Sequence, residues 1–131
     1  MNLEELRRKY LENGFSLANA SAKISQDIIL NKISKSKMNK NVTIKGGVVM
    51  HCLSNDKRRA TRDLDLDFIK YSLADESIRK FVDTLNSVDD GIKVYIDGEI
   101  QELHHQDYKG KRVNIILKDK NNFNVTAKLN I

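Results

Sequence analysis

Three aspartates, Asp63, Asp65 and Asp67, stand at every second position of the otherwise largely apolar segment TRDLDLDFI. Because successive side chains of a strand point to opposite faces, this alternation places the three carboxylates on one face, with spacings of about 6.5 to 7 Å between their Cα atoms. Carboxylates at that spacing repel one another unless a cation compensates them. Mg²⁺ takes one or two carboxylates and completes its shell with water and substrate phosphates. The pattern therefore indicates a metal–nucleotide site, with a solvated strand face as the alternative.

Two adjacent glycines, Gly46 and Gly47, lie upstream, between a predicted strand at Val42–Ile44 and a predicted short helix at Val48–Leu53. Backbone N–H groups at a glycine turn that opens a helix can approach a phosphate closely and meet it with the positive end of the helix dipole. Neither the turn nor the aspartate strand is specific alone. Their order within one short unit favours a phosphate-binding turn followed by a metal-binding strand.

A calcium-binding loop is another interpretation of these aspartates, because Asp63, Asp65 and Asp67 match positions one, three and five of an EF-hand. Position six would need glycine and is Phe68, and position twelve would need glutamate and is Ala74. The leucines between the aspartates also belong on a strand and not in a loop. The calcium interpretation is therefore rejected.

The composition is that of an ordered domain, with 131 residues, 40% hydrophobic and 31% charged. A net charge of +5 permits polyanionic partners, so a basic RNA-binding domain without chemistry stays a third-ranked hypothesis. The single cysteine, Cys52, is no disulfide framework, and no apolar run approaches the ~20 residues of a membrane span. Adjacent His104 and His105 would point to opposite strand faces and do not indicate zinc. We expect a cytoplasmic protein without membrane contact.

Apolar residues recur at helical spacing in three segments, NLEELRRKYLENG, SLANASAKISQDIILNKISKS and LADESIRKFVDTLNSV. The second of these helices is predicted to end near Ser36. Its apolar stripe is predicted to consist of Leu17, Ala20, Ile24, Ile28 and Ile33. Lys23, Gln26 and Lys32 are predicted to lie off that stripe.

Strands are predicted at VTI, TRDLDLDFI, IKVYI, EIQEL, KRVNIIL and NVTAKLNI, with turns such as Asp97-Gly98 and KDKNN between the later ones. Helices first and a mostly antiparallel sheet later make the fold class α+β. The sequence shows no internal repeat and no linker. Residues 1–131 are therefore predicted to be a single domain.

The motif KGG at 45–47, followed by RATRDLD at 59–65, resembles the first motif of the AbiEii/AbiGii toxin-type nucleotidyltransferases of the DNA polymerase β-like superfamily. The later segments YKGKRVNIIL and VTAKLNI resemble the strand pair that follows it in this family. The resemblance implies a polymerase β-like nucleotidyltransferase fold, a mixed, mostly antiparallel sheet flanked by helices. It also implies transfer of a nucleotidyl group from an NTP with Mg²⁺ or Mn²⁺, in a toxin–antitoxin or phage-defence system. Some members use tRNA as the acceptor, and a cognate antitoxin is an expected partner.

The resemblance also implies a role for each matched residue. Asp63 and Asp65 would be the catalytic metal ligands. Among the nucleotide-binding residues, Gly46 and Gly47 would contact the triphosphate, and Arg59 and Thr61 would support the loop or the phosphates. Lys45 would reach a phosphate or be an ordinary exposed lysine. Asp67 lies outside the motif and is expected either to support the ligands from behind or to be solvated. Because it shares their face, it is also a candidate for a further ligand.

The superfamily's third carboxylate is expected on a later strand, where the segment KLNI places Asn130. An asparagine can coordinate a metal through oxygen, but it adds no charge and cannot act as a base. If its strand lies beside the aspartate strand, Asn130 is predicted to face Asp63 and Asp65. Relatives continue with a largely helical part, so a fragment is one alternative. Another is a degenerate copy that acts as a nucleotide- or protein-binding module.

Overall fold

A computed structural model describes residues 2–44, 63–104 and 109–131. The short helix predicted at Val48–Leu53, Cys52 and His105 lie outside the described residues.

The described helices are α1 (Leu3–Glu12), α2 (Leu17–Lys35) and α4 (Asp75–Leu85). Side-chain oxygens of Asn2 and Ser16 accept hydrogen bonds from backbone N–H groups of the first turns of α1 and α2. Such N-caps explain why each helix begins where it does. Gly14, with φ of 90°, takes the left-handed conformation that ends α1 and lets the chain turn into α2. None of the described helices is long and apolar enough to cross a membrane.

The described strands are β1 (Val42–Ile44), β2 (Asp63–Phe68), β3 (Lys93–Ile96), β4 (Gln101–His104), β5 (Lys109–Lys118) and β6 (Asn124–Asn130). They form one sheet in the order β1-β2-β6-β5-β3, with β4 also paired to β5. Within the described ranges, β2 and β6 are the one parallel pair, and all other neighbours are antiparallel. The predicted α+β class and the mostly antiparallel sheet are thereby confirmed.

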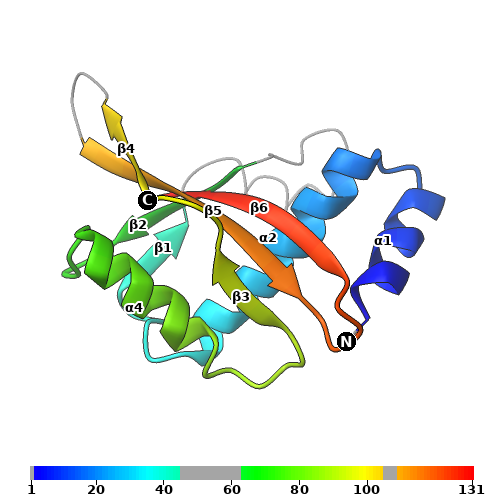
Figure 1. Cartoon of the computed structure of the whole chain (residues 1–131), viewed down its shortest axis with the longest axis horizontal. Coiled ribbons are helices and arrows are strands. Elements are labelled where there is room, and N and C mark those ends of the chain that lie inside the picture. The colour runs from blue at the N-terminus through cyan, green and yellow to red at the C-terminus, as the bar shows by residue number, and fades with distance from the viewer. Residues whose placement is uncertain (1, 45–62, 105–108) are drawn as a thin grey trace.

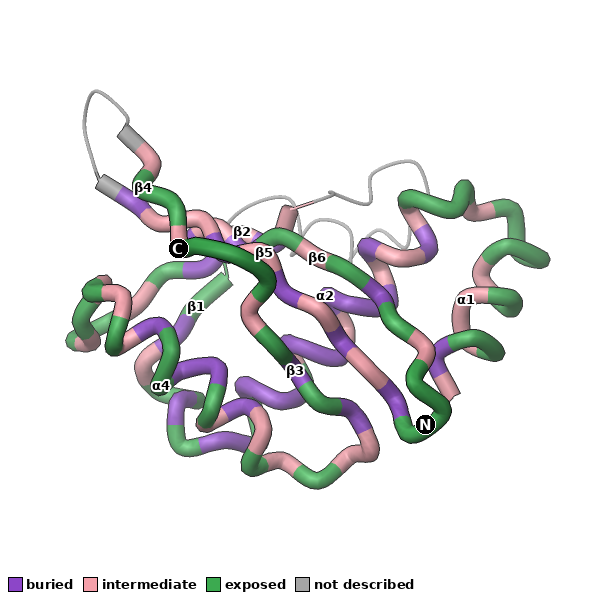
Figure 2. Tube along the Cα trace, in the orientation of Figure 1, coloured by how far each residue is buried: buried purple, intermediate pink, exposed green. Residues whose placement is uncertain are grey.

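The apolar core lies between one face of this sheet and the helices α2 and α4. Figure 1 shows α2 passing behind β5 and β6, and α4 lying beside β3. On β2 the alternation is strict, with Leu64 and Leu66 1% and 0% exposed. The Phe68 ring meets the ring of Phe81 on α4 edge to face at 5.1 Å. Figure 2 shows the resulting pattern, with buried stretches along α2 and α4 and alternating burial along β6.

The predicted stripe of α2 is partly wrong. Leu17 is 57% exposed, whereas Gln26 and Lys32 are 3% and 0% exposed. Lys32 can be buried because its ammonium group donates to the carboxylate of Asp90, with Nζ 2.7 Å from Oδ1, and to the carbonyl of Ile92 at 2.9 Å. A buried charge needs such partners, and these come from the distant connection between α4 and β3.

Candidate functional site

The parallel pairing of β2 with β6 brings the aspartates of β2 next to the polar residues at the end of β6. Asp63 is the Cα partner of Lys128, and Asp65 is the Cα partner of Asn130. Side chains at matching positions of neighbouring strands share a face, so these four polar groups lie on one side of the sheet. The opposite side is occupied at this point by Leu64, which belongs to the core.

The side chain of Asn130 faces both aspartates, as predicted. Its amide nitrogen Nδ2 donates to Oδ1 of Asp65 at 3.0 Å and to Oδ2 of Asp63 at 3.3 Å. The amide therefore bridges two carboxylates that lie next to each other on the same face of β2. This is the position at which the resemblance leads one to expect a third carboxylate.

Arg112 completes the cluster from β5, where it is the Cα partner of Asn130. Its Nε donates to Oδ1 of Asn130 at 2.9 Å, and its Nη2 lies 3.4 Å from Oδ2 of Asp63. We use the name acidic pair for Asp63 and Asp65. Arg112 was not predicted as a site residue from the sequence. The turn KDKNN was the available signal, since a hairpin centred on Asn121 already places Arg112 opposite Asn130.

Lys111, the neighbour of Arg112, takes no part in this cluster. Its Nζ lies 2.9 Å from Oδ1 of Asp75 at the start of α4 and 3.5 Å from the carboxylate of Glu102. The hydrogen bond with Asp75 raises the pKa of Lys111 above its usual value, against a smaller opposing effect of burial. Lys111 thus ties β5 to α4, whereas Arg112 lies beside the acidic pair.

The acidic pair is the part of this cluster that could hold a divalent cation. Carboxylate oxygens are the ligands that Mg²⁺ prefers, and one or two of them suffice when substrate phosphates and water complete the shell. Over the described ranges, no group of three or more His, Cys, Asp and Glu side chains could hold a metal ion. The donor set therefore fits a cation that shares its coordination with a phosphate-bearing substrate, and not a closed protein cage.

Asp67 lies one step further along β2, opposite Thr43 of β1. It is exposed, and the two hydrogen bonds donated by Asn130 go to Asp63 and Asp65. Its role as a ligand or as a solvated residue stays a prediction. The five predicted nucleotide-binding residues, Lys45, Gly46, Gly47, Arg59 and Thr61, lie outside the described residues.

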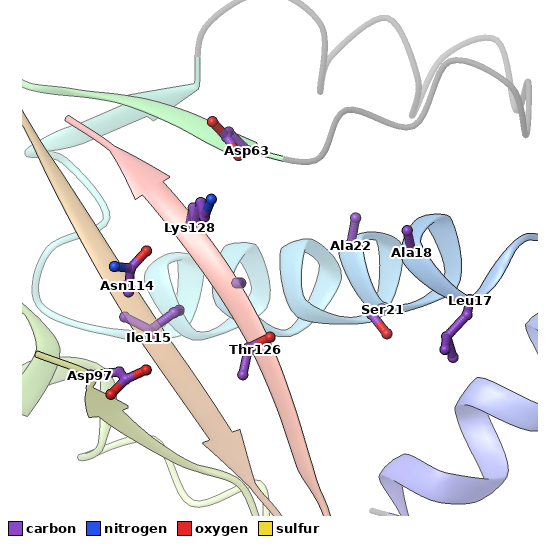
Figure 3. A pocket seen from close by; sticks show the side chains of 11 residues that line it. Leu17, Ala18, Ser21, Ala22, Asp63, Asp97, Asn114, Ile115, Thr126 and Lys128 are labelled. Carbon is purple, nitrogen blue, oxygen red and sulfur yellow. The ribbon is translucent and has the colours of Figure 1, made fainter.

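A cavity of about 600 Å³ opens next to Asp63. Figure 3 shows it between the first turns of α2 and the strands β2, β5 and β6. Its polar lining includes Lys128 and Asn114, and its apolar lining includes Leu17 and Ala18 of α2. A mixed lining and a carboxylate at the rim suit a polar ligand with one flat or apolar part.

The mixed sheet, its helices and the paired aspartates are consistent with a nucleotidyltransferase-like fold. A family model described as "Nucleotidyl transferase AbiEii toxin, Type IV TA system" matches residues 28–130. The chain belongs to this AbiEii family. A comparison with curated proteins gave no match.

Membership confirms the family that the motifs KGG and RATRDLD indicated, and the matched residues include the second half of α2 and every described strand. It implies a nucleotidyltransferase toxin of a type IV toxin–antitoxin system, with a nucleotide substrate and a cognate antitoxin. Nucleotidyltransferases of this kind typically use divalent metals.

Proposed function

We propose that Asp63 and Asp65 hold Mg²⁺ or Mn²⁺ and that the chain transfers a nucleotidyl group from an NTP to an acceptor hydroxyl. The observation that carries the proposal is the parallel β2–β6 pair, which gathers the acidic pair, Asn130 and Lys128 on one face beside the cavity. One core contains residues from α1 to Ile131, which supports residues 1–131 as a single nucleotidyltransferase-like domain.

In the proposed reaction, the acceptor oxygen forms a bond to the α-phosphorus of the NTP. The bond from that phosphorus to the oxygen bridging to the β-phosphate breaks, and pyrophosphate leaves. When bound, the cation would neutralise phosphate charge and align the α-phosphorus with the acceptor. The hydroxyl proton goes to a carboxylate oxygen of Asp63 or Asp65 or to water, because the amide of Asn130 is not a base.

The cavity is the proposed place for the rest of the nucleotide. Lys128 lies opposite Asp63 and lines the cavity, so its ammonium group is positioned to meet a phosphate. The alanines Ala18 and Ala22 leave room at the apolar wall for a base or ribose. Gly46 and Gly47, where the sequence predicts a turn, are proposed to bind the triphosphate, since β1 ends at Ile44 beside the aspartate strand.

We propose an RNA, with tRNA as the first candidate, as the acceptor. The net charge of +5 favours association with a polyanion, and Arg112 and Lys128 place positive charge around the acidic pair. The cognate antitoxin that the family implies is the proposed protein partner.

A second candidate function is a non-catalytic nucleotide- or protein-binding module. The observation that favours it is Asn130, because the third position of the site carries no charge and offers no base. Such a module would retain nucleotide affinity and use its surface for the antitoxin or another protein.

Transfer of label from α-³²P NTPs to total tRNA, with Mg²⁺ or Mn²⁺, distinguishes the two candidates. Asp65→Asn should lower transfer by at least about 100-fold, because a metal ligand supplies several kcal/mol of transition-state stabilisation. Asp83→Asn, which removes the same charge from the exposed side of α4, is the matched control. Wild-type protein that binds NTP without transferring label would support the binding module, and equal transfer by wild type and Asp65→Asn would refute the site.

A further inference from the structure

The amide of Asn130 presents different chemistry on its two sides. Its oxygen accepts from Arg112 Nε at 2.9 Å, and its nitrogen donates to the acidic pair at 3.0 and 3.3 Å. Turning the amide over would place its NH₂ group against the Nε–H of Arg112 and its oxygen against two carboxylates. Both contacts would then be repulsive. Arg112 therefore fixes the amide so that N–H groups, and not the oxygen, face Asp63 and Asp65.

The same guanidinium sets the charge of the site. Arg112 Nη2 lies 3.4 Å from Oδ2 of Asp63, and the two side chains are 34% and 32% exposed. The four hydrogen-bonded side chains, two carboxylates, one guanidinium and one neutral amide, carry a formal charge of −1, and the exposed Lys128 opposite Asp63 adds one more positive charge on the same face. A site with three carboxylates and no guanidinium would carry −3 and could balance two divalent cations. The affinity of a site made of oxygen ligands for divalent cations increases with the number of charged ligands. This cluster is therefore suited to a single divalent cation.

We propose that Arg112 is a positioning residue that holds Asn130 with its amide nitrogen toward the acidic pair and stands in for a second cation. The site then binds a single divalent cation. This inference rests on the proposed function, which assigns Asp63 and Asp65 as the ligands of that cation. It concerns how many ions the acidic pair takes and which residue sets that number.

The test is titration of the full chain with Mn²⁺ alone, following free aqueous Mn²⁺ by electron paramagnetic resonance. Wild type should bind one ion per chain. Arg112→Gln should bind it about tenfold more tightly, because a unit charge about 6 Å from any divalent ion changes its affinity by about that factor even in water. Arg79→Gln removes the same charge from an exposed position of α4 and should leave the affinity unchanged.

Arg112→Lys separates charge from orientation, because lysine keeps the charge but lacks the Nε–H that fixes the amide. In Arg112→Lys, Asn130 can turn its oxygen to the ion. The Mn²⁺ affinity of this variant should therefore be higher than that of wild type but lower than that of Arg112→Gln. Asn130→Asp combined with Arg112→Gln gives three carboxylates and no guanidinium, and this double variant should bind a second ion per chain. Binding of two ions by wild type, or an unchanged Mn²⁺ affinity in both Arg112 variants, would overturn the proposed role of Arg112. It would leave the assignment of Asp63 and Asp65 as metal ligands in place.

Asp65→Asn reports on the proposed function itself. Loss of the single ion in this variant would locate the ion at the acidic pair. Retention of the ion, or no Mn²⁺ binding by any variant, would overturn the metal assignment and the role of Arg112 together. Thermal melts of each variant without Mn²⁺ show whether it folds, and Arg112→Lys keeps the test decisive if Arg112→Gln does not.

Discussion

Asn130 Nδ2 lies 3.0 Å from Oδ1 of Asp65, across the parallel pairing of β6 with β2. Because an amide cannot accept a proton, we expect slow transfer by wild type and faster transfer by Asn130→Asp. General-base assistance is typically worth about 10² to 10⁴ in rate, which bounds the gain. Label transfer from α-³²P NTPs measures it. Asn124→Asp, at the exposed start of β6, is the control, and a gain in both variants would assign the effect to net charge.

A second prediction concerns stability in the presence of ligands. Mg²⁺ together with an NTP should raise the melting temperature of wild type, because a ligand that binds only the folded state stabilises it by mass action. At one hundred times its Kd, such a ligand contributes about 2.7 kcal/mol. Asp65→Asn should show a smaller rise, measured by scanning fluorimetry against each variant without ligand. Equal shifts in the two proteins would mean that Asp65 is not part of the binding site.

Local patterns were sufficient to predict the elements of the site but not all of its members. Alternation placed Asp63 and Asp65 on one strand face, a prediction that depends only on residues close in sequence. Asn130 is 65 residues from Asp65, and it was placed beside the aspartates through the family resemblance of the segment KLNI. The role of Arg112 depends on the register of the β5–β6 hairpin, which joins residues 18 apart. Helical periodicity could not predict the burial of Lys32, since its partner Asp90 is 58 residues away.

That buried pair gives a third prediction. Lys32 donates to Asp90 and to the carbonyls of Val88 and Ile92, and its side chain is fully buried. Lys32→Met would leave these acceptors unpaired and should lower the free energy of unfolding by about 3 to 5 kcal/mol. Urea denaturation measures the loss. Lys35→Met, at the exposed end of α2, should change it by less than about 0.5 kcal/mol. Similar losses in both variants would argue against the buried pair.

A fourth prediction concerns acid stability and Asp119, which starts the turn between β5 and β6. Burial raises the pKa of Asp119, but hydrogen bonds from the backbone N–H groups of Leu3, Phe123 and Asn121 outweigh it and lower the pKa below its usual value. A carboxyl group with a lowered folded-state pKa stabilises the fold above its unfolded pKa of about 3.9. This contribution is lost as the pH falls through the folded-state pKa.

Asp119→Asn should therefore be less stable than wild type at pH 7, by about 1 to 3 kcal/mol, and the difference should shrink as the pH falls below about 4. Urea midpoints measured from pH 7 to pH 3 report it. Asp83→Asn on the exposed side of α4 serves as the control. A constant difference across that range would mean that the charge of Asp119 is not what stabilises the turn.

The last prediction tests whether the cavity beside Asp63 is where the nucleotide binds. Ala18 lies on the exposed side of α2 and lines this cavity of about 600 Å³, so Ala18→Trp should fill much of the apolar wall without disturbing the core. The helix-propensity cost of the change is below about 0.7 kcal/mol, so the fold should persist. Binding of fluorescent NTP analogues should weaken by at least about tenfold, a loss of about 1.4 kcal/mol. Lys35→Trp places the same ring at the other end of α2 and should bind normally. Unchanged binding by Ala18→Trp would exclude the cavity and leave the acidic pair as the nucleotide's contact in the described part of the chain.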